Sequence, residues 1–293
     1  FDTTTVVYYD DGDKEEPLLK HGFSKERRSD LKQVVVGLAL SEDGAPLSHE
    51  VFSGNTNDGT CFKKTIKKFQ AQYTESNITF VGDRGLISGK NIDLLIASGY
   101  NYILGFKMRS IPKAERHEIF TNKKWKPITK DLEYRDIDYK GHRLVIYQLF
   151  DGIFILSTNT KLKAEEIVTR YRDLWQCESG FRTLKSELEL QPLFHRKERR
   201  IRSHVFICFI ALIFKNMLLK KMRKLDNKIS YLKTLRELKT LRAMSIKIYK
   251  TTLVVRTEIK TNAKIAFKAL QTAFPKKVLK HENSSRLIVM RSK

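Results

Sequence analysis

The first 60 residues follow the pattern of short β-strands joined by turns. Residues 1–10 (FDTTTVVYYD) are rich in β-branched and aromatic types, and residues 33–40 (QVVVGLAL) form an apolar run of strand length. The dipeptide Asp43-Gly44 marks a turn, after which residues 46–52 (PLSHEVF) alternate like a second hairpin arm. The pattern therefore predicts three strands, followed by a loop over residues 54–60 (GNTNDGT).

A change of spacing after residue 60 predicts helices that alternate with further strands. Apolar positions in residues 61–72 recur at helical intervals, and residues 88–99 form a helix that starts at a serine and stops at a glycine. Between these helices, ITFVGD (78–83) is a short buried strand that ends in an acid. YNYILGF (100–106) is expected to be the next strand.

Residues 107–150 mix charged residues with short strand-like pieces such as HRLVIYQLF (142–150), and we interpret them as an inserted β-rich subdomain. DGIFILSTN (151–159) then returns to the main sheet. Helices are expected to dominate after residue 162, over roughly 163–189, 200–221 and 227–245.

This order of elements suits a mixed α/β sheet flanked by helices. We divide the chain into a first part of the core (1–106), the β-rich insertion (107–150), the remainder of the core (151–222) and a basic C-terminal region (223–293) for dimerisation or DNA binding. One fold class hosts many functions, so function has to be sought in charge and side-chain chemistry.

Positive charge is concentrated in the second part of the chain. The whole chain has 56 Lys and Arg against 33 Asp and Glu, a net charge of +23. Residues 1–160 have 23 basic and 22 acidic residues, a net of +1, whereas residues 161–293 have 33 and 11, a net of +22. Such a field attracts a polyanion, because each neutralised phosphate releases counterions. A solvated surface is the alternative, but the size of the excess favours nucleic acid.

The cysteines and the apolar runs exclude other classes of protein. Cys61, Cys177 and Cys208 are odd in number and lack CxxC spacing, so neither a disulfide framework nor a zinc ribbon is indicated, and a reducing, cytoplasmic setting fits. The longest apolar run, residues 205–214, is too short to span a bilayer and predicts a buried helix. The chain starts without an initiator Met, and we interpret it as a fragment or as a protein whose natural N-terminus is missing.

Three acids stand on separate predicted elements. Asp2 lies in the first strand, Asp83 closes the fourth strand, and Glu178 lies on a long helix. Two-metal phosphoryl transfer needs carboxylates that converge from separate elements on ions roughly 3.5–4 Å apart, and Mg²⁺ suits such a site. Each acid also has an ordinary alternative. Asp2 could be a surface acid, Asp83 could form a salt bridge in a turn, and Glu178 could pair with Arg182.

The helix around Glu178 is more informative. Tyr171, Leu174, Glu178 and Lys185 are separated by 3, 4 and 7 residues, which puts them on one stripe of a continuous helix. With Arg182 beside it, this stripe offers a metal ligand and then several donors for DNA phosphates. A solvent-facing helix with ordinary ion pairs is the alternative.

Five segments, in this order, resemble the DDE transposases of bacterial insertion sequences. They are FDTTTV, GFSKERRSDLKQVVVGLAL, GNTNDGT, FVGDRGLIS and YRDLWQCESGFRTLKSELELQPLFH, and the resemblance runs from residue 1 to about residue 220. The sequence looks most similar to the insertion-sequence-four type, in which a Tyr/Arg/Glu/Lys signature surrounds the catalytic Glu. The resemblance implies an RNase H-like fold with a β-rich insertion between the second Asp and the Glu.

The resemblance also implies roles for individual residues. Asp2, Asp83 and Glu178 correspond to the metal triad, and Tyr171 and Lys185 match signature positions that hold the DNA backbone. Leu174 departs from the pattern because it stands at the usual Arg position, so either that phosphate contact is absent or Arg172 or Arg182 replaces it. Trp125 is a candidate, by location only, to support a flipped base, and a packing role for it is the alternative.

The implied reaction is cut-and-paste transposition, in which a 3′-hydroxyl is exposed, a hairpin forms and opens, and the same hydroxyl attacks target DNA. Two Mg²⁺ ions per site, or Mn²⁺ as a substitute, are expected. Double-stranded DNA is the expected partner, with a homodimer on DNA, no membrane and no small-molecule substrate. A nucleoid-associated location in a bacterial cytoplasm follows from the same resemblance.

Two further segments are expected near the active face, by the same resemblance. Lys25, Arg27, Arg28 and Lys32 form a basic loop that we expect to contact DNA, whereas Asn55 and Asn57 are expected to have a positioning role. His204 heads the apolar helix and is interpreted as a satisfied, buried histidine. A DNA-binding remnant without activity and an RNase H-like nuclease of another role, such as RNA processing, remain the competing functions.

Overall fold

The computed structural model describes residues 1–9, 16–73, 78–121, 125–150, 152–249 and 251–282. The chain forms two compact units, Phe1–Leu212 and Ile213–Lys293, which are considered separately below. The division between the units therefore falls earlier than residue 223, where the sequence predicts the C-terminal region to begin.

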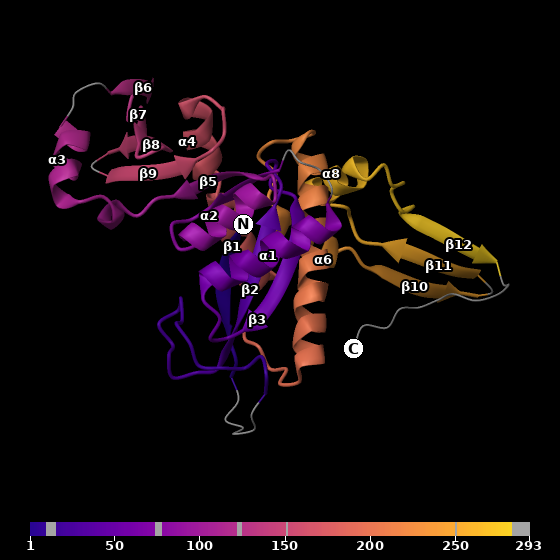
Figure 1. Cartoon of the computed structure of the whole chain (residues 1–293). Coiled ribbons are helices and arrows are strands. Elements are labelled where there is room, and N and C mark those ends of the chain that lie inside the picture. The colour runs from indigo at the N-terminus through magenta and orange to yellow at the C-terminus, as the bar shows by residue number, and fades with distance from the viewer. Residues whose placement is uncertain (10–15, 74–77, 122–124, 151, 250, 283–293) are drawn as a thin grey trace. The chain divides into compact units, whose positions relative to one another are not determined.

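The first sheet of unit Phe1–Leu212 has three antiparallel strands in the order β1-β2-β3. They are β1 (Asp2–Val7), β2 (Gln33–Leu40) and β3 (Pro46–Ser53). Strand β2 is apolar along most of its length because nearly all of it is buried between its two neighbours. All three predicted strands, and the hairpin between the second and the third, are confirmed (Figure 1).

The second sheet has six strands in the order β4-β5-β9-β8-β7-β6, with β4 and β5 parallel and the others antiparallel. The strands are β4 (Thr79–Gly82), β5 (Asn101–Gly105), β6 (Lys126–Thr129), β7 (Leu132–Tyr139), β8 (His142–Leu149) and β9 (Gly152–Thr158). The mixed α/β class is thus confirmed. The strands expected in the insertion exist, and they extend the sheet that begins with β4 and β5 (Figure 1).

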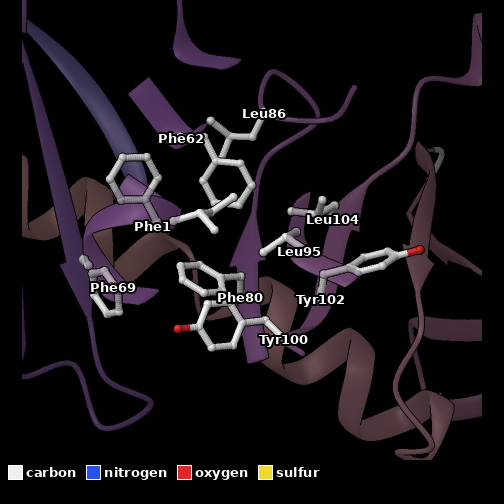
Figure 2. Close-up of a cluster of buried hydrophobic side chains, with 11 residues drawn as sticks. Phe1, Phe62, Phe69, Phe80, Leu86, Leu95, Tyr100, Tyr102 and Leu104 are labelled. Carbon is white, nitrogen blue, oxygen red and sulfur yellow. The ribbon is translucent and has the colours of Figure 1, made fainter. Parts of the chain in front are cut away.

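The first strands of the two sheets are joined where the candidate acids lie. The backbone nitrogen of Phe1 donates to the carbonyl of Val81, 2.9 Å away, so the start of β1 lies beside the end of β4. The side chains of Phe1, Phe62 and Phe80 meet beneath this junction in a buried cluster with aliphatic neighbours (Figure 2). Burial of aromatic rings of this size is a large hydrophobic contribution, which fixes the junction in place.

Two helices supply the outer side of that cluster. Helix α1 (Asp58–Gln72) buries Phe62, Ile66 and Phe69, which recur at helical spacing, and the side chain of Asn57 caps its first turn. Helix α2 (Gly89–Ala97) starts at Ser88, whose hydroxyl accepts from the backbone of Asn91. Both helices match the predicted segments.

The long helix predicted over residues 163–189 is wrong as one continuous element. The structure has α4 (Ala164–Arg172), α5 (Trp175–Arg182) and a π-helical turn, η2 (Thr183–Glu187). The backbone nitrogens of Leu174 and Gln176 donate to the carbonyls of Tyr171 and Asp173, three residues earlier. Bonds of this span belong to a 3₁₀ turn, so the α-helical pattern is interrupted between α4 and α5. Because of this break, the four residues assigned to one stripe are divided among separate helical segments.

The remaining elements of this unit include the short helices η1 (Met108–Ser110) and α3 (Lys113–Thr121). They lie over the strands β7–β9, and Ile111, Leu144, Ile146 and Ile155 form the local core. Helix α6 (Glu198–Arg223) begins in this unit and crosses the division, and it confirms the predicted helix over 200–221.

In unit Ile213–Lys293, helices precede and interrupt a small antiparallel sheet in the order β10-β11-β12. The elements are α7 (Tyr231–Lys239), β10 (Ala243–Ile248), β11 (Thr251–Arg256), α8 (Thr261–Ala269) and β12 (Val278–Glu282). The predicted helix over 227–245 is therefore wrong beyond Thr240, because β10 pairs with β11 from Ala243 on. Of the helices in the described ranges, none combines the length and the apolar character that crossing a membrane requires.

Candidate active site

Asp2 lies near the start of β1, at the junction with β4. One of its carboxylate oxygens accepts a hydrogen bond from the backbone nitrogen of Thr3 at 2.7 Å, and the same oxygen lies 3.7 Å from Nζ of Lys25. Burial raises the pKa of Asp2 above its ordinary value, although the nearby ammonium acts in the opposite direction. Asp2 is only partly buried, and a carboxylate in such a place can bind a cation, which offsets the hydration that burial removes.

Lys25 is expected from the sequence to contact DNA, but in this structure its ammonium lies beside the carboxylates of Asp2 and Asp58. Its ammonium donates to the carbonyl of Thr3 at 2.6 Å and to the Thr3 hydroxyl at 3.1 Å. The same nitrogen lies 3.9 Å from an oxygen of Asp58 as well as near Asp2. Lys25 is therefore the positive charge that sits between two carboxylates of different elements.

Asp58 is an acid of this region that the sequence pattern alone does not single out. The Thr3 hydroxyl donates to its Oδ1 at 2.5 Å, and its Oδ2 lies beside Gly85, where an added Cβ would be 3.4 Å away. Asn57 caps α1 and so places Asp58 in the first turn. The available signal was an acid directly after the Asn that starts a helix, in a loop already expected near the active face.

Asp83 directly follows β4 and is held by two donors. Its Oδ1 accepts from the backbone nitrogen of Arg84 at 2.7 Å and from the phenol of Tyr171 at 3.1 Å. The Tyr171 hydroxyl reaches this point because residue 105 is glycine, since an added Cβ would lie 2.5 Å from that oxygen. Burial and the neighbouring Asp83 raise the pKa of Tyr171, so its phenol stays protonated. In the described structure no ion pair joins the side chains of Asp83 and Arg84.

Glu178 lies on α5 and is exposed. Its neighbour Cys177 is buried next to the Phe1 nitrogen and Asp2, and burial raises the pKa of its thiol. Gly180 allows α5 to approach β2 closely, since an added Cβ would lie 3.0 Å from Leu38. Helix α5 packs on β2 and also contacts β1, the strand that carries Asp2. In the described structure Glu178 forms no ion pair with Arg182.

The three acids predicted as a triad come from elements that meet, but their side chains do not enclose a common point. Within the described ranges, no three His, Cys, Asp or Glu side chains are arranged to hold a metal ion. A pocket of about 210 Å³ lies against the Phe1, Val81 and Cys177 side chains, and none of the three acids lines it. The triad therefore stays a prediction.

Lys185, expected on the DNA backbone, is engaged within the protein. Its ammonium donates to Glu26 Oε1 at 2.5 Å, and Gln191 donates to the other carboxylate oxygen at 2.7 Å. Burial alone would raise the pKa of Glu26, but the hydrogen bonds from Lys185 and Gln191 outweigh it and leave the pKa below its ordinary value. Lys185 is thus oriented by the loop that also carries Lys25.

The other arginines expected at DNA are exposed. Arg172 and Arg182 lie on α4 and α5 with their side chains in solvent. Arg28 forms a two-pronged pair with Asp30 and lies over the Tyr9 ring at 5.9 Å. Arg27 is exposed in a left-handed conformation, with φ of 59°.

Four other residues have local structural roles. Trp125 packs on the core of β8 and β9, with the Arg135 guanidinium 5.8 Å from its ring centre. The backbone carbonyl of Lys32 accepts a hydrogen bond from the backbone nitrogen of Tyr8. The side-chain oxygen of Asn55 accepts one from the Ser53 hydroxyl. His204 is half-buried and lies 3.2 Å from the carbonyl of Glu189, so it is satisfied as predicted but less buried.

Comparison with known proteins gives an independent assignment. Residues 1–214 match the family model described as the transposase DDE domain. A search of curated proteins found no match. The matched range covers more than two thirds of the chain and contains every residue of the candidate site, and proteins of this family act on DNA in transposition. The chain therefore belongs to the transposase DDE domain family.

Proposed function

We propose that this chain carries out metal-dependent DNA strand cleavage and strand transfer as the catalytic part of an insertion-sequence transposase. The observation that carries the proposal is the meeting of four elements at one place. Asp2 on β1 and Asp83 after β4 are brought near each other by the Phe1–Val81 hydrogen bond. Tyr171 of α4 contacts Asp83, and α5 packs on β1.

The chemistry of the donors fits a hard divalent cation. Asp2, Asp83 and Glu178 supply carboxylate oxygens, which are the ligands that Mg²⁺ prefers. The Lys25 ammonium between Asp2 and Asp58 supports a cation-binding role for this junction, because it marks a point of negative potential. When bound, such ions would activate an oxygen nucleophile and stabilise charge on the phosphate. Glu178, which is exposed, would have to turn toward the other two acids.

The roles of the neighbouring residues follow from their contacts. Tyr171 would orient the Asp83 carboxylate through its phenol, and Arg172 and Arg182, which are exposed, would be available to DNA phosphates. Lys185 would keep its place through Glu26 and offer its remaining ammonium hydrogens to the backbone of DNA. Leu174 would leave the usual arginine contact of the signature unfilled.

The finer parts of the proposal rest on the sequence resemblance. They are the insertion-sequence-four branch, an RNase H-like arrangement of the core, two Mg²⁺ ions per site, a cut-and-paste reaction with a hairpin step and a homodimer on DNA. The parallel pair β4-β5, flanked by helices and extended by antiparallel strands, supports the fold part of this set.

A DNA-binding remnant without activity is the second candidate. It is favoured by the side-chain arrangement, since the three acids do not enclose an ion, and by Leu174 in the signature. This candidate predicts salt-sensitive binding to DNA with no strand breaks in Mg²⁺ or Mn²⁺.

Cleavage of DNA that carries the terminal inverted repeats of the source element tests the proposal. We expect the unmodified chain to nick this substrate in Mg²⁺ or Mn²⁺ but not in EDTA, and to leave RNA and hybrid duplexes intact. Asp83→Asn should abolish nicking and retain DNA binding, whereas Asp93→Asn, which changes an exposed acid on α2, should nick normally. Equal nicking by Asp83→Asn would refute the assignment, and preferential cutting of RNA would indicate a different nuclease.

A further inference from the structure

The unit Ile213–Lys293 carries most of the positive charge of the chain. It contains 22 Lys and Arg residues against 4 Asp and Glu, a net of +18 out of the total of +23. The family match ends at residue 214, next to the start of this unit, so the family assigns it no role. A charge of this size within 81 residues requires an explanation of its own.

Two of the four acids of the unit, Asp226 and Glu237, accept hydrogen bonds from the backbone at a turn or at a helix end. Glu237 of α7 accepts from the backbone nitrogen of Ala263 at 3.0 Å and from the amide of Asn262 at 2.5 Å. Asp226 accepts from the backbone nitrogen of Lys228 at 2.9 Å. These carboxylates stabilise a turn and a helix end, and the four acids of the unit are too few to balance its 22 basic residues.

Almost every basic side chain in the described part of the unit is exposed. These residues are Lys220, Lys221, Arg223, Lys224, Lys228, Lys233, Arg236, Lys239, Arg242, Lys247, Lys260, Lys264, Lys268, Lys276 and Lys277. By contrast, the unit has four acids in all, of which Glu258 is exposed and Asp226 and Glu237 are partly buried. The described surface of the unit is therefore strongly cationic.

Two helices arrange part of this charge in rows. Lys260, Lys264 and Lys268 are four residues apart at the start of α8 and along it, so they follow one stripe with a rise of about 6 Å between neighbours. Lys233, Arg236 and Lys239 form a similar exposed row on α7. We call these six residues the paired basic rows.

A small core holds the two helices together. Met222, Ile229 and Ala266 are buried, and Leu238 of α7 and Ile265 of α8 pack against them. Glu237 of α7 also caps the first turn of α8. The paired basic rows therefore stand on helices whose other faces are fixed against each other, which keeps the row geometry constant.

We propose that unit Ile213–Lys293 is a DNA-binding module that holds duplex DNA through its phosphate backbone, with the paired basic rows as a main contact. The proposal deepens the function proposed above and rests on it for the choice of DNA. Duplex DNA presents one negative charge per about 1.7 Å of its axis. Rows of exposed Lys and Arg fit this regular, dense charge better than they fit the scattered carboxylates of an acidic protein. Contact with phosphates fixes position without reading sequence, so this module holds any duplex.

The test is equilibrium binding of the full chain to a 30-base-pair duplex of arbitrary sequence in EDTA, between 50 and 200 mM salt. EDTA removes catalysis from the measurement, so failure of the nuclease proposal leaves the result readable. The test variant carries Lys260→Gln, Lys264→Gln and Lys268→Gln. The control carries Lys63→Gln, Lys67→Gln and Lys90→Gln, exposed lysines of α1 and α2 that change the net charge equally.

The slope of log K against log salt should become shallower by about 0.9 for each phosphate that the variant no longer neutralises, or about 2.7 for three phosphates. We expect most of this change in the test variant and little in the control. Equal slopes for the test variant and the unmodified chain, or an equal change in the control, would overturn the proposal. Circular dichroism and thermal unfolding of both variants verify that the substitutions leave the fold intact. Adding Lys233→Gln, Arg236→Gln and Lys239→Gln should reduce the slope further.

Discussion

Replacing Tyr171 by phenylalanine separates two roles for this residue. The sequence resemblance assigns Tyr171 to a DNA phosphate, whereas in the structure its phenol donates to Asp83 Oδ1 at 3.1 Å. Phenylalanine keeps the ring, which packs among buried residues of β8 and α4 and lies 6.5 Å from the Tyr147 ring centre. The substitution therefore removes one hydroxyl and little else.

The size of the effect follows from the geometry of that bond. A hydrogen bond to a charged acceptor contributes about 1.5–3 kcal/mol, but this one is long for an O–H donor and its acceptor is exposed to water. We therefore expect the free energy of unfolding to fall by about 1 kcal/mol. In a unit of this size such a change lowers Tm by about 2–4 °C.

The same change should weaken the response to metal. If the phenol orients Asp83, Tyr171→Phe should raise the Mn²⁺ concentration needed for half-maximal thermal stabilisation, measured without DNA by differential scanning fluorimetry. Because the pKa of Tyr171 is raised above its ordinary value near 10, the phenol remains a donor between pH 6 and 9. The difference between the two proteins should therefore stay constant across that range.

Tyr147→Phe is the matched control. It removes a hydroxyl from the neighbouring ring, and in the described structure this hydroxyl forms no bond to Asp83. The reasoning is refuted if Tyr171→Phe leaves both the unfolding free energy and the Mn²⁺ response unchanged. An effect confined to DNA affinity would assign Tyr171 to the phosphate instead.

Two other substitutions test features that the sequence does not reveal. Asp58→Asn keeps an acceptor for the Thr3 hydroxyl but removes a negative charge near Asp2. We therefore expect the affinity for Mn²⁺, measured by calorimetry, to fall by a few-fold to about tenfold. An unchanged affinity would exclude Asp58 from the site. Glu237→Ala removes the cap of α8 and should cost about 1 kcal/mol at pH 7. Burial opposes the hydrogen bonds at Glu237, but its pKa is lowered, so this contribution is fully present above the ordinary value of 4.5 and is lost as pH falls through the lowered pKa of the folded chain. Unfolding by urea should therefore show a smaller difference from the unmodified chain at pH 3 than at pH 7.

The strands of the core can be predicted well from the sequence because their signals are local. QVVVGLAL has no polar residue after its first position, and the structure makes it a strand with the predicted bounds. Residues 243–245 show the opposite case, since they fall at the end of the helix predicted over residues 227–245, whereas the structure places them in β10. Ile246 and Ile248 favour a strand only once Leu253 and Thr251 pair with them.

The break between α4 and α5 has no signal of this kind. Asp173 and Leu174 are ordinary helix residues, and no proline or glycine marks the tightened turn. The site can be predicted only in part for a related reason. A pattern names Asp2 and Asp83, but it does not say that Lys25 lies between Asp2 and Asp58 or that Tyr171 contacts Asp83.

Strand β1 and the helices α4 and α5 meet in the fold but lie far apart in the sequence. This separation has a consequence during synthesis. Glu178 is made 176 residues after Asp2, and the helices that carry Tyr171 and Cys177 emerge after both sheets are complete. At about 5–20 residues per second, this delay is roughly 10–35 s on the ribosome. An interrupted product that ends before α4 would contain both sheets yet lack the partner of Asp83 and the helix beside Asp2, so the contacts of the candidate site can form only in a chain that extends past α5.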